Sequence, residues 1–190
     1  MNDRVDRHRH DLDRFDLAIL KALQADNRIP QRLIAKAVGL SAPAVQRRIR
    51  RLEENGVIQA NVAVVDPFKL GQAITLLVAV EMESERRQAL DAAKRAFAAA
   101  EEVQQCYYVT GEADFVLVVT VPSMADYEAL TKRLFFQNNN VKRFTTFVAM
   151  DRVKVGLTVP LGPTTTSDSA NAATVVSRSA ARSRRGQRPR

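Results

Sequence analysis

A run of side chains that can bind nucleic acid lies between residues 41 and 51. The amide of Gln46 can pair bidentately with adenine, and the guanidinium of Arg47 can pair with guanine. Arg50 and Arg51, one helical turn further on, better suit phosphate oxygens. The residues before them are small and would let a helix end approach a groove closely: Ser41, Ala42, Pro43 and Ala44. This pattern predicts a DNA-contacting helix; a solvated charged face on an ordinary three-helix domain is the alternative.

Residues that could catalyse a reaction are scarce. Both histidines, His8 and His10, lie in the polar first ten residues, so Ser-His-Asp and Cys-His arrangements are not available to a folded core. The sequence has no Gly-x-x-x-x-Gly-Lys phosphate loop. Two histidines in a polar segment are weak support for a metal, and Cys106 lies in a strand pattern as a small buried hydrophobe. We expect no enzyme, no catalytic residue, no metal and no cofactor.

The spacing of apolar residues predicts three short helices to carry the basic side chains. The first covers about residues 13–25, with Asp11 or Asp13 as its cap, and the third runs from Ser41 to Asn55. Between the second and third, Gly39-Leu40-Ser41 combines a left-handed turn residue, an apolar plug and a strong cap, as in a helix-turn-helix. A short strand is expected at 57–62. We assign a helix-turn-helix domain to residues 12–60, after a polar segment at 1–11.

Residues 72–161 follow a different pattern, in which apolar strands alternate with helices. Strands are expected at 75–82, 103–110, 115–121 and 141–150. Helices are expected at 84–100 and from Ser123 to Asn138, with Ser84 and Ser123 as their caps. The order βαββαβ predicts a ferredoxin-like α+β domain with both helices on one face of an antiparallel sheet. Residues 61–71, which include Pro67, form an extended connector.

The predicted third strand is apolar on both faces. Phe115, Leu117 and Val119 point one way, while Val116 and Val118 point the other. An antiparallel sheet with helices on one face commonly leaves its other face to water, so this second face needs a cover. We expect a second copy of the chain to cover it in a two-fold dimer.

The charge of the chain is unevenly distributed. Its 190 residues have a formal net charge of +8, divided as +4 over residues 1–60, −1 over 61–162 and +5 over 163–190. Residues 162–190 hold almost nothing to bury, so we predict a disordered Arg-rich tail. Such a tail acts either as a non-specific DNA arm or as a dispensable extension.

No part of the sequence indicates a secreted or membrane protein. The first ten residues lack an apolar stretch, and the longest apolar runs are far shorter than a span of ~20 residues. A single cysteine fits a reducing compartment. We expect a cytoplasmic, nucleoid-associated protein with no membrane partner.

Three segments resemble one known family. Residues 34–41 (Ile-Ala-Lys-Ala-Val-Gly-Leu-Ser) resemble its helix-turn-helix, and residues 48–58 resemble the helix and strand that follow. Residues 109–115 (Val-Thr-Gly-Glu-Ala-Asp-Phe) resemble the central segment of its regulatory domain. The family is the leucine-responsive regulatory protein and AsnC (Lrp/AsnC) group of bacterial and archaeal transcription factors, and the likeness covers about residues 13–161.

The resemblance implies more than the residues alone. Members of this family combine a winged helix-turn-helix domain with a ferredoxin-like regulatory (RAM) domain, and bind promoter DNA as dimers that often assemble into tetramers or octamers. Many sense amino acids at the interface between regulatory domains. The family's Gly-x-x-Asp turn lies at that pocket, which implies an effector site at Thr110, Gly111, Glu112 and Asp114. A carboxylate at Asp114 would pair an α-ammonium group; an ordinary hairpin turn, in which Asp114 bonds local backbone, is the alternative.

Ala113, Pro30 and the Arg-rich tail depart from the family pattern. Two other functions remain open from the residues themselves. One is a small-molecule-binding or enzymatic ferredoxin-like domain with an accessory helical domain. The other is an RNA-binding sheet, for which only one of the adjacent Tyr107 and Tyr108 could stack on a base.

Overall fold

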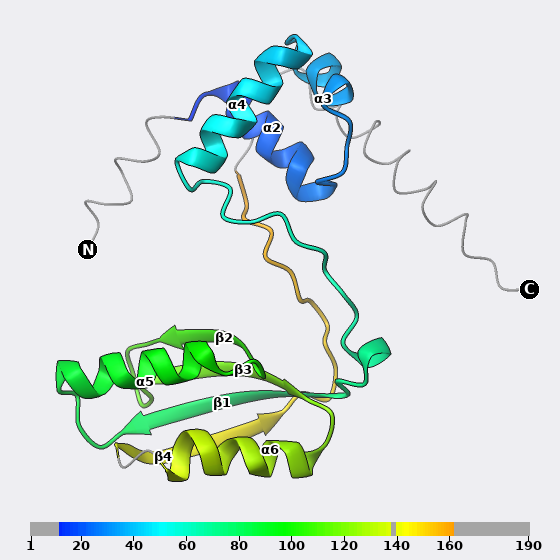
Figure 1. Cartoon of the computed structure of the whole chain (residues 1–190). Coiled ribbons are helices and arrows are strands. Elements are labelled where there is room, and N and C mark those ends of the chain that lie inside the picture. Colours follow the sequence, from blue (N-terminus) through cyan, green and yellow to red (C-terminus); the bar gives the residue numbers. More distant parts are fainter. Residues whose placement is uncertain (1–11, 138–139, 162–190) are drawn as a thin grey trace, which may run out of the picture. The chain divides into compact units, whose positions relative to one another are not determined.

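The computed structural model describes residues 12–137 and 140–161. These residues form two compact units: residues 12–63 together with 156–161, and residues 64–155 (Figure 1). The predictions for residues 1–11 and 162–190 concern segments outside the described residues.

The first unit is a three-helix domain. Its helices are α2 (Arg14–Ala25), α3 (Gln31–Val38) and α4 (Ala42–Glu54), as the apolar spacing predicted. Each helix contributes to one small core, whose buried residues are Ile19, Ile34, Ala35 and Val45. Asp13, and not the undescribed Asp11, caps α2: its carboxylate accepts hydrogen bonds from the Phe15 and Asp16 amides.

The strand predicted at 57–62 is wrong, because the described chain has no strand between α4 and the second unit. The amides of Val57 and Ile58 instead donate to the Leu52 carbonyl, at 2.9 and 3.1 Å. Gly56, at φ 68°, makes the left-handed turn that directs them there. Donors that close the end of a helix cannot also bond a neighbouring strand.

The second unit has the predicted βαββαβ order. Its elements are β1 (Ile74–Met82), α5 (Arg87–Ala99), β2 (Val103–Tyr108), β3 (Phe115–Val121), α6 (Met124–Thr131) and β4 (Val141–Val148). The sheet order is β2-β3-β1-β4 and every neighbouring pair is antiparallel. A short 3₁₀ turn, η1 (Phe68–Leu70), precedes β1 within the predicted connector.

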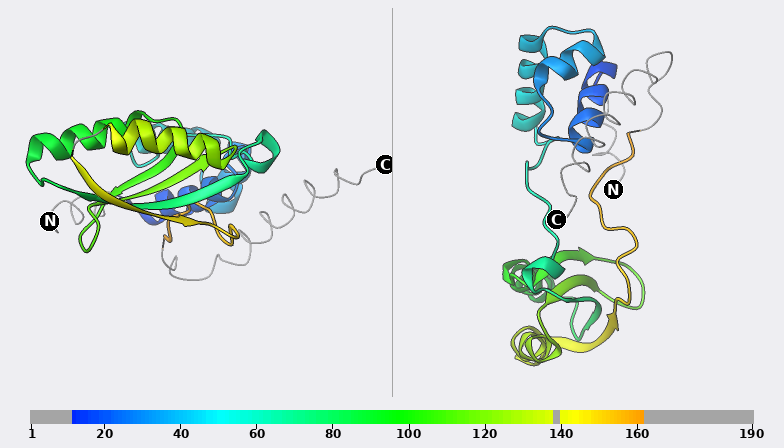
Figure 2. Two further views of the ribbon diagram at one scale, coloured as in Figure 1. Left: turned by 90° about the horizontal axis from the view of Figure 1, so that it is seen from below. Right: turned by 90° about the vertical axis from the view of Figure 1, so that its right-hand side faces the viewer.

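Both helices of this unit lie over the same face of the sheet (Figure 2). That face carries alternate residues of the two central strands, including Val78 and Leu117, which are completely buried. Phe97 of α5 packs edge-on against Phe115 and Phe135, with ring centroids 5.3 and 6.1 Å apart. Aromatic pairs in this arrangement stabilise a core beyond the area that they bury.

The opposite face of the sheet is apolar in the middle of the two central strands, as predicted. The register places Leu77 between Val118 and Phe147, and Val116 between Ala79 and Tyr107. Leu77, Tyr107 and Phe147 are 40%, 51% and 59% exposed, so no described residue of the chain covers this surface. We call Leu77, Ala79, Tyr107, Val116, Val118 and Phe147 the open face.

Several predicted boundaries in this unit are wrong. Helix α5 begins at Arg87 and its cap, Arg86, makes no side-chain bond, so Ser84 is not the cap. Ser84 instead exchanges two hydrogen bonds with the side chain of Asn140, 56 residues away. Strand β2 ends at Tyr108 because Val109 closes the following turn onto Asp114, and β4 ends at Val148, two residues before its predicted end.

The helix capped by Ser123 starts as predicted but changes its winding. Ser123 accepts a hydrogen bond from the Asp126 amide at 3.2 Å. After Thr131 the chain continues as a π-helix, η2 (Lys132–Phe136), and the Gln137 amide donates to the Lys132 carbonyl five residues earlier. The extra residue per turn is accommodated where Leu134 and Phe135 are both buried.

The last described segment groups with the three-helix unit. Residues 156–161 are part of the first unit, whereas the sequence analysis placed them at the end of the second domain. The Gln24 side chain of α2 accepts a hydrogen bond from the Val159 amide at 2.7 Å and donates one to the Val159 carbonyl at 3.2 Å. No helix among the described residues is long and apolar enough to cross a membrane.

Candidate nucleic-acid interface and effector turn

The turn between α3 and α4 has the predicted geometry. Gly39 adopts φ 72°, a left-handed conformation that glycine adopts without strain. The Leu40 amide then bonds back to the Ala35 carbonyl at 3.0 Å, and Leu40 packs against the small core. This turn sets the direction in which α4 leaves.

Helix α4 starts with the small residues that the sequence placed there. Ser41 is its cap and accepts a hydrogen bond from the Ala44 amide at 3.3 Å. Pro43 is exposed, while Ala42 and Ala44 are half-buried. The positive end of the helix dipole is therefore flanked by short side chains, an arrangement that lets backbone N–H groups approach a phosphate.

The predicted base-reading and phosphate-binding side chains lie on one exposed surface of α4. Gln46, Arg47, Arg50 and Arg51 are all exposed, whereas Val45 and Leu52 on the other side are buried. These contacts match a helix that packs on its apolar stripe and offers its polar face outward. The structure thus places the four candidate side chains on one exposed surface, and their contact with DNA stays a prediction.

One of these arginines has a partner that the sequence analysis missed. Nη2 of Arg51 lies 2.6 Å from Oδ2 of Asp16 on α2, and Nη1 of Arg48 lies 2.8 Å from Oδ1 of the same carboxylate. Asp16 is completely buried. The Asp13-x-x-Asp16 spacing of a capping box, which the structure contains, predicts the bond that Asp16 accepts from the Asp13 amide but not its arginine partners.

Asp13 extends this charge cluster. Its Oδ2 lies 2.7 Å from Nη1 of Arg48. Burial acts to raise the pKa of the Asp13 carboxyl, but hydrogen bonds from the Asp16 amide and the Arg48 guanidinium outweigh it and hold the pKa below its ordinary value. The hydrogen bond to Asp16 raises the pKa of Arg48. The guanidinium of Arg48 also lies over the Phe15 ring, 5.3 Å from its centroid.

The predicted effector residues lie in the turn between β2 and β3. Thr110, Gly111 and Glu112 are exposed, and Asp114 is half-buried. Gly111 adopts φ 135°, and no heavy atom other than its own and those of its two chain neighbours lies within 4 Å of where a Cβ would stand. The backbone angle, rather than crowding, therefore favours glycine here.

Asp114 connects this turn to the first strand. Its amide donates to the Val80 carbonyl at 2.9 Å, and its Oδ2 accepts from the Met82 amide at 2.7 Å. The hairpin alternative anticipated a bond to local backbone, whereas this bond joins Asp114 to another strand, 32 residues away in the sequence. A carboxylate offers about four lone-pair sites, so one amide leaves acceptor capacity for a ligand.

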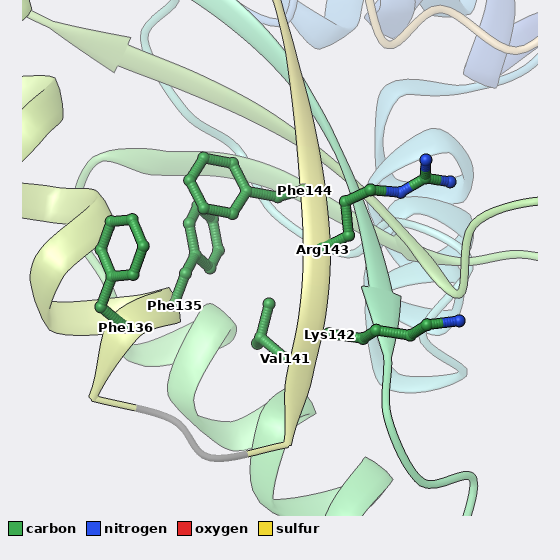
Figure 3. Close-up of a pocket in the computed structure, with 6 residues that line it drawn as sticks. All are labelled: Phe135, Phe136, Val141, Lys142, Arg143 and Phe144. Carbon is green, nitrogen blue, oxygen red and sulfur yellow. The ribbon is translucent and has the colours of Figure 1, made fainter.

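A shallow hollow of about 270 Å³ lies elsewhere on this unit, between the π-helix and β4. Figure 3 shows Phe135, Phe136 and Phe144 on one side of β4 and the charged ends of Lys142 and Arg143 on the other. Those two cations both contact Glu81 of β1, and the hydrogen bond from Lys142 lowers the pKa of that carboxyl. The hollow contains none of the predicted site residues.

Two further observations concern chemistry. Within residues 12–137 and 140–161, no group of three His, Cys, Asp or Glu side chains is placed to hold a metal ion. Cys106 is half-buried against the main core, and burial raises the pKa of its thiol. A thiol with a raised pKa is a poor nucleophile at neutral pH.

Known protein families match both units. Residues 12–59 match the winged helix-turn-helix DNA-binding model, and residues 75–159 match the Lrp/AsnC ligand binding domain model. Among curated proteins, an HTH-type transcriptional regulator of Sinorhizobium fredii is 45% identical over 151 residues, covering 80% of this chain and 89% of the relative. The leucine-responsive regulatory protein of Escherichia coli is 34% identical over 154 residues, covering 81% and 94%.

Solved structures agree with this result. An AsnC family transcriptional regulator from Agrobacterium tumefaciens superposes with a TM-score of 0.74 at 33% identity, covering 79% of this chain and 97% of that chain. A transcriptional regulator from Neisseria meningitidis has the same fold at a TM-score of 0.73 and 22% identity, covering 79% and 97%. Relatives that are regulators along nearly their whole length indicate a non-enzyme, and the chain belongs to the Lrp/AsnC family of helix-turn-helix transcriptional regulators.

Proposed function

We propose that the chain is a sequence-specific DNA-binding regulator whose activity responds to an amino acid or related small metabolite, bound where the C-terminal units of two copies meet. The proposal of DNA binding rests on the exposed polar face of α4. Gln46, Arg47 and Arg50 lie on this face, and they follow a helix start that Ser41 caps and that has small side chains. In a helix-turn-helix, the second helix of the pair enters the major groove, and here that helix is α4.

Selection of genome fragments by the purified full-length protein, with and without a pool of amino acids, tests this function. The recovered sites should show half-sites about one helical turn, ~34–36 Å, or a multiple apart. Random recovered sequences would contradict sequence-specific binding. Sites that are identical with and without amino acids would contradict the effector.

Arg47 is assigned to base readout and Arg50 to phosphate contact. Replacing Arg47 with Ala should cost ~1–3 kcal/mol of discrimination on the selected site if the contact is bidentate. Arg50→Ala is the matched control, because losing a phosphate contact weakens all sequences alike. Equal losses on specific and random duplexes in the Arg47 variant would show that the readout role is wrong.

A second copy of the chain is the occupant proposed for the open face. Its paired residues Leu77 and Phe147 are apolar and exposed, and the central strands beside them are apolar too. Burying such a surface against its own copy is the ordinary solution for a two-fold dimer. Assembly of dimers into tetramers or octamers belongs to the same proposal.

Light scattering at micromolar concentration tests the dimer. Wild type should have at least twice the mass of one chain, and Leu77→Lys should dissociate it by placing an unpaired charge in an apolar interface. Met124→Lys is the matched control: Met124 is 49% exposed at the start of α6, away from the open face. A monomeric wild type would contradict the proposal, as would a dimer that Leu77→Lys leaves intact.

The effector proposal rests on the turn that contains Thr110, Gly111, Glu112 and Asp114. The E. coli relative is named for its response to leucine, and the N. meningitidis structure is a complex with L-methionine. In this chain the turn offers an exposed backbone at Gly111 for an α-carboxylate and the Asp114 carboxylate for an α-ammonium group.

The Asp114→Asn variant separates effector binding from the structural bond between Asp114 and the Met82 amide. Asparagine keeps a side-chain oxygen for the Met82 amide but removes the charge that would pair with an ammonium group. Calorimetric titration with individual L-amino acids should show heat for wild type and little for the variant, while affinity for duplex DNA stays at the wild-type level. Equal titrations would leave Asp114 with its structural role alone.

The Arg-rich tail is assigned to non-specific contact with phosphates. Its six arginines can add affinity and salt dependence but no sequence readout. Deleting residues 163–190 should therefore flatten the dependence of DNA affinity on salt and leave the selected sites unchanged. A different preferred sequence after deletion would contradict this assignment.

A further inference from the structure

Asp16 is a completely buried carboxylate that is not part of the apolar cluster of the first unit. It lies on α2, yet both of its oxygens bond arginines of α4: Oδ1 to Arg48 at 2.8 Å and Oδ2 to Arg51 at 2.6 Å. Oδ2 also accepts the Asp13 amide at 3.1 Å. Burying a carboxylate away from solvent costs free energy unless ion pairs and hydrogen bonds compensate, so the pairing is part of how α2 and α4 fit together.

The two arginines are held to different degrees. Arg48 is 22% exposed and contacts Asp13, Asp16 and the Phe15 ring. The side chain of Arg51 is 48% exposed, and its Nη2 contacts Oδ2 of Asp16. Its guanidinium is thus directed back across the domain toward α2, although its Cα lies on the outward side of α4. The neighbouring Arg47 and Arg50 are exposed, and no ion pair among the described residues includes either of them.

We propose that Asp16 is a positioning residue for DNA binding: it holds Arg48 and Arg51 against α2, so that Arg47 and Arg50 are the arginines of α4 that contact DNA. This inference rests on the proposed function and revises one part of it, the assignment of Arg51 to phosphates. The consequence is greater discrimination between DNA sequences. Each cation that does not face the DNA lowers affinity for every sequence alike, so base contacts supply a larger share of the binding free energy.

The salt dependence of DNA affinity is the measurement that separates positioning from a purely structural role. The logarithm of the binding constant falls with the logarithm of salt concentration, with a slope of about −0.9 per phosphate contact. We would measure this slope by fluorescence anisotropy on a labelled duplex of random sequence, using full-length protein. Every variant carries the same tail, so the tail's contribution cancels in each comparison.

Four variants give distinct expectations. Arg50→Gln should flatten the slope by about 0.9 per chain, whereas Arg51→Gln should leave it near the wild-type value. Asp16→Asn removes the charge that holds Arg51, and should steepen the slope by about 0.9 per chain. Adding Arg51→Gln to Asp16→Asn should return the slope to the wild-type value. A cluster that only stabilised the domain would lower the melting temperature of Asp16→Asn and leave its slope unchanged.

Specific results would overturn the inference. Equal flattening by Arg51→Gln and Arg50→Gln would show that Arg51 contacts phosphate in the wild type; this comparison decides the matter even if Asp16→Asn does not fold. A folded Asp16→Asn variant with the wild-type slope would also overturn it. Both results leave the proposed function standing, while a wild-type protein that binds no duplex would remove the proposed function and this inference together.

Discussion

The two units of this chain reach a stable fold by different means. The first has a buried apolar cluster of four residues, supplemented by the completely buried carboxylate of Asp16 and its two arginines. The second buries fifteen apolar residues in one cluster, and its buried polar residues among those described are Thr120 and Thr131. The described core of the DNA-binding unit thus includes a buried carboxylate with two arginine partners, whereas the described core of the ligand-binding unit is almost entirely apolar.

This difference follows from what each unit has to present. A small helical domain that offers a basic face has little apolar area to bury, and an ion-pair network fixes helix orientation without adding apolar surface. A sheet that is apolar on both faces has the opposite composition: one face forms a core with its helices, and the other remains for a partner.

The largest expected effect is a truncation in the larger core. Phe97→Ala removes a completely buried ring in edge-on contact with Phe115 and Phe135, and should cost about 3–5 kcal/mol of unfolding free energy. Denaturant unfolding should show this loss in the transition of the second unit, with the transition of the first unit unmoved. Phe136→Ala, at a ring that is 69% exposed, is the control and should cost far less. Equal shifts of both transitions would break the division into two units.

Two equivalent helix caps, one in each unit, test the same division of the chain with a smaller expected loss of unfolding free energy. Ser41 caps α4 in the first unit and Ser123 caps α6 in the second, each by accepting a hydrogen bond from an amide three residues on. Replacing either with Ala should cost about 1 kcal/mol, each in the transition of its own unit. Circular dichroism during denaturant unfolding measures both. A Ser41 variant that shifts the second transition would show that the units are coupled in stability.

Acid should affect the first unit through Asp13. The folded-state pKa of this carboxyl lies below its ordinary value of 3.8, so its contribution to stability is present above that value and is lost as the pH falls through the folded pKa. Asp13→Asn retains a good helix cap but no titrating group. The unfolding midpoint should therefore drop less between neutral pH and pH values below 3.8 in this variant than in wild type. Equal drops would remove Asp13 from the acid sensitivity of the unit.

The smallest effect is expected at the surface of the second unit. Glu128 and Lys132 form an exposed i,i+4 ion pair at 2.7 Å on the α6–η2 segment. Exposed pairs of this kind contribute little, because water and salt screen them. Glu128→Gln should leave the melting temperature of the second unit within experimental error. A clear decrease would mean that exposed ion pairs contribute measurably to the stability of the second unit.

Local features of the fold could be predicted from the sequence, and long-range ones could not. Gly39 and Ser41 were recognisable because each acts within a few residues of its own position, on a turn and on a helix start. Alternating apolar residues likewise predicted β3 with its observed bounds. Asp16 was missed because its two partners lie 32 and 35 residues further along the chain.

The errors have the same origin. Ser84 has the right residue type for a cap, but Asn140 bonds its backbone from the far end of the unit. The strand expected at 57–62 has apolar residues at suitable positions, but the first two of its amides close α4. For the candidate sites, residue type and spacing predicted which side chains of α4 are exposed, yet not that Arg51 would turn back to Asp16.

The first unit is built from two described segments that are far apart in the sequence, residues 12–63 and 156–161. The side chain of Gln24 bonds both the amide and the carbonyl of Val159, so the second segment is attached to α2 through its backbone. A fragment that ended at Val155 would therefore lack part of the first unit, although residues 12–63 contain α2, α3 and α4.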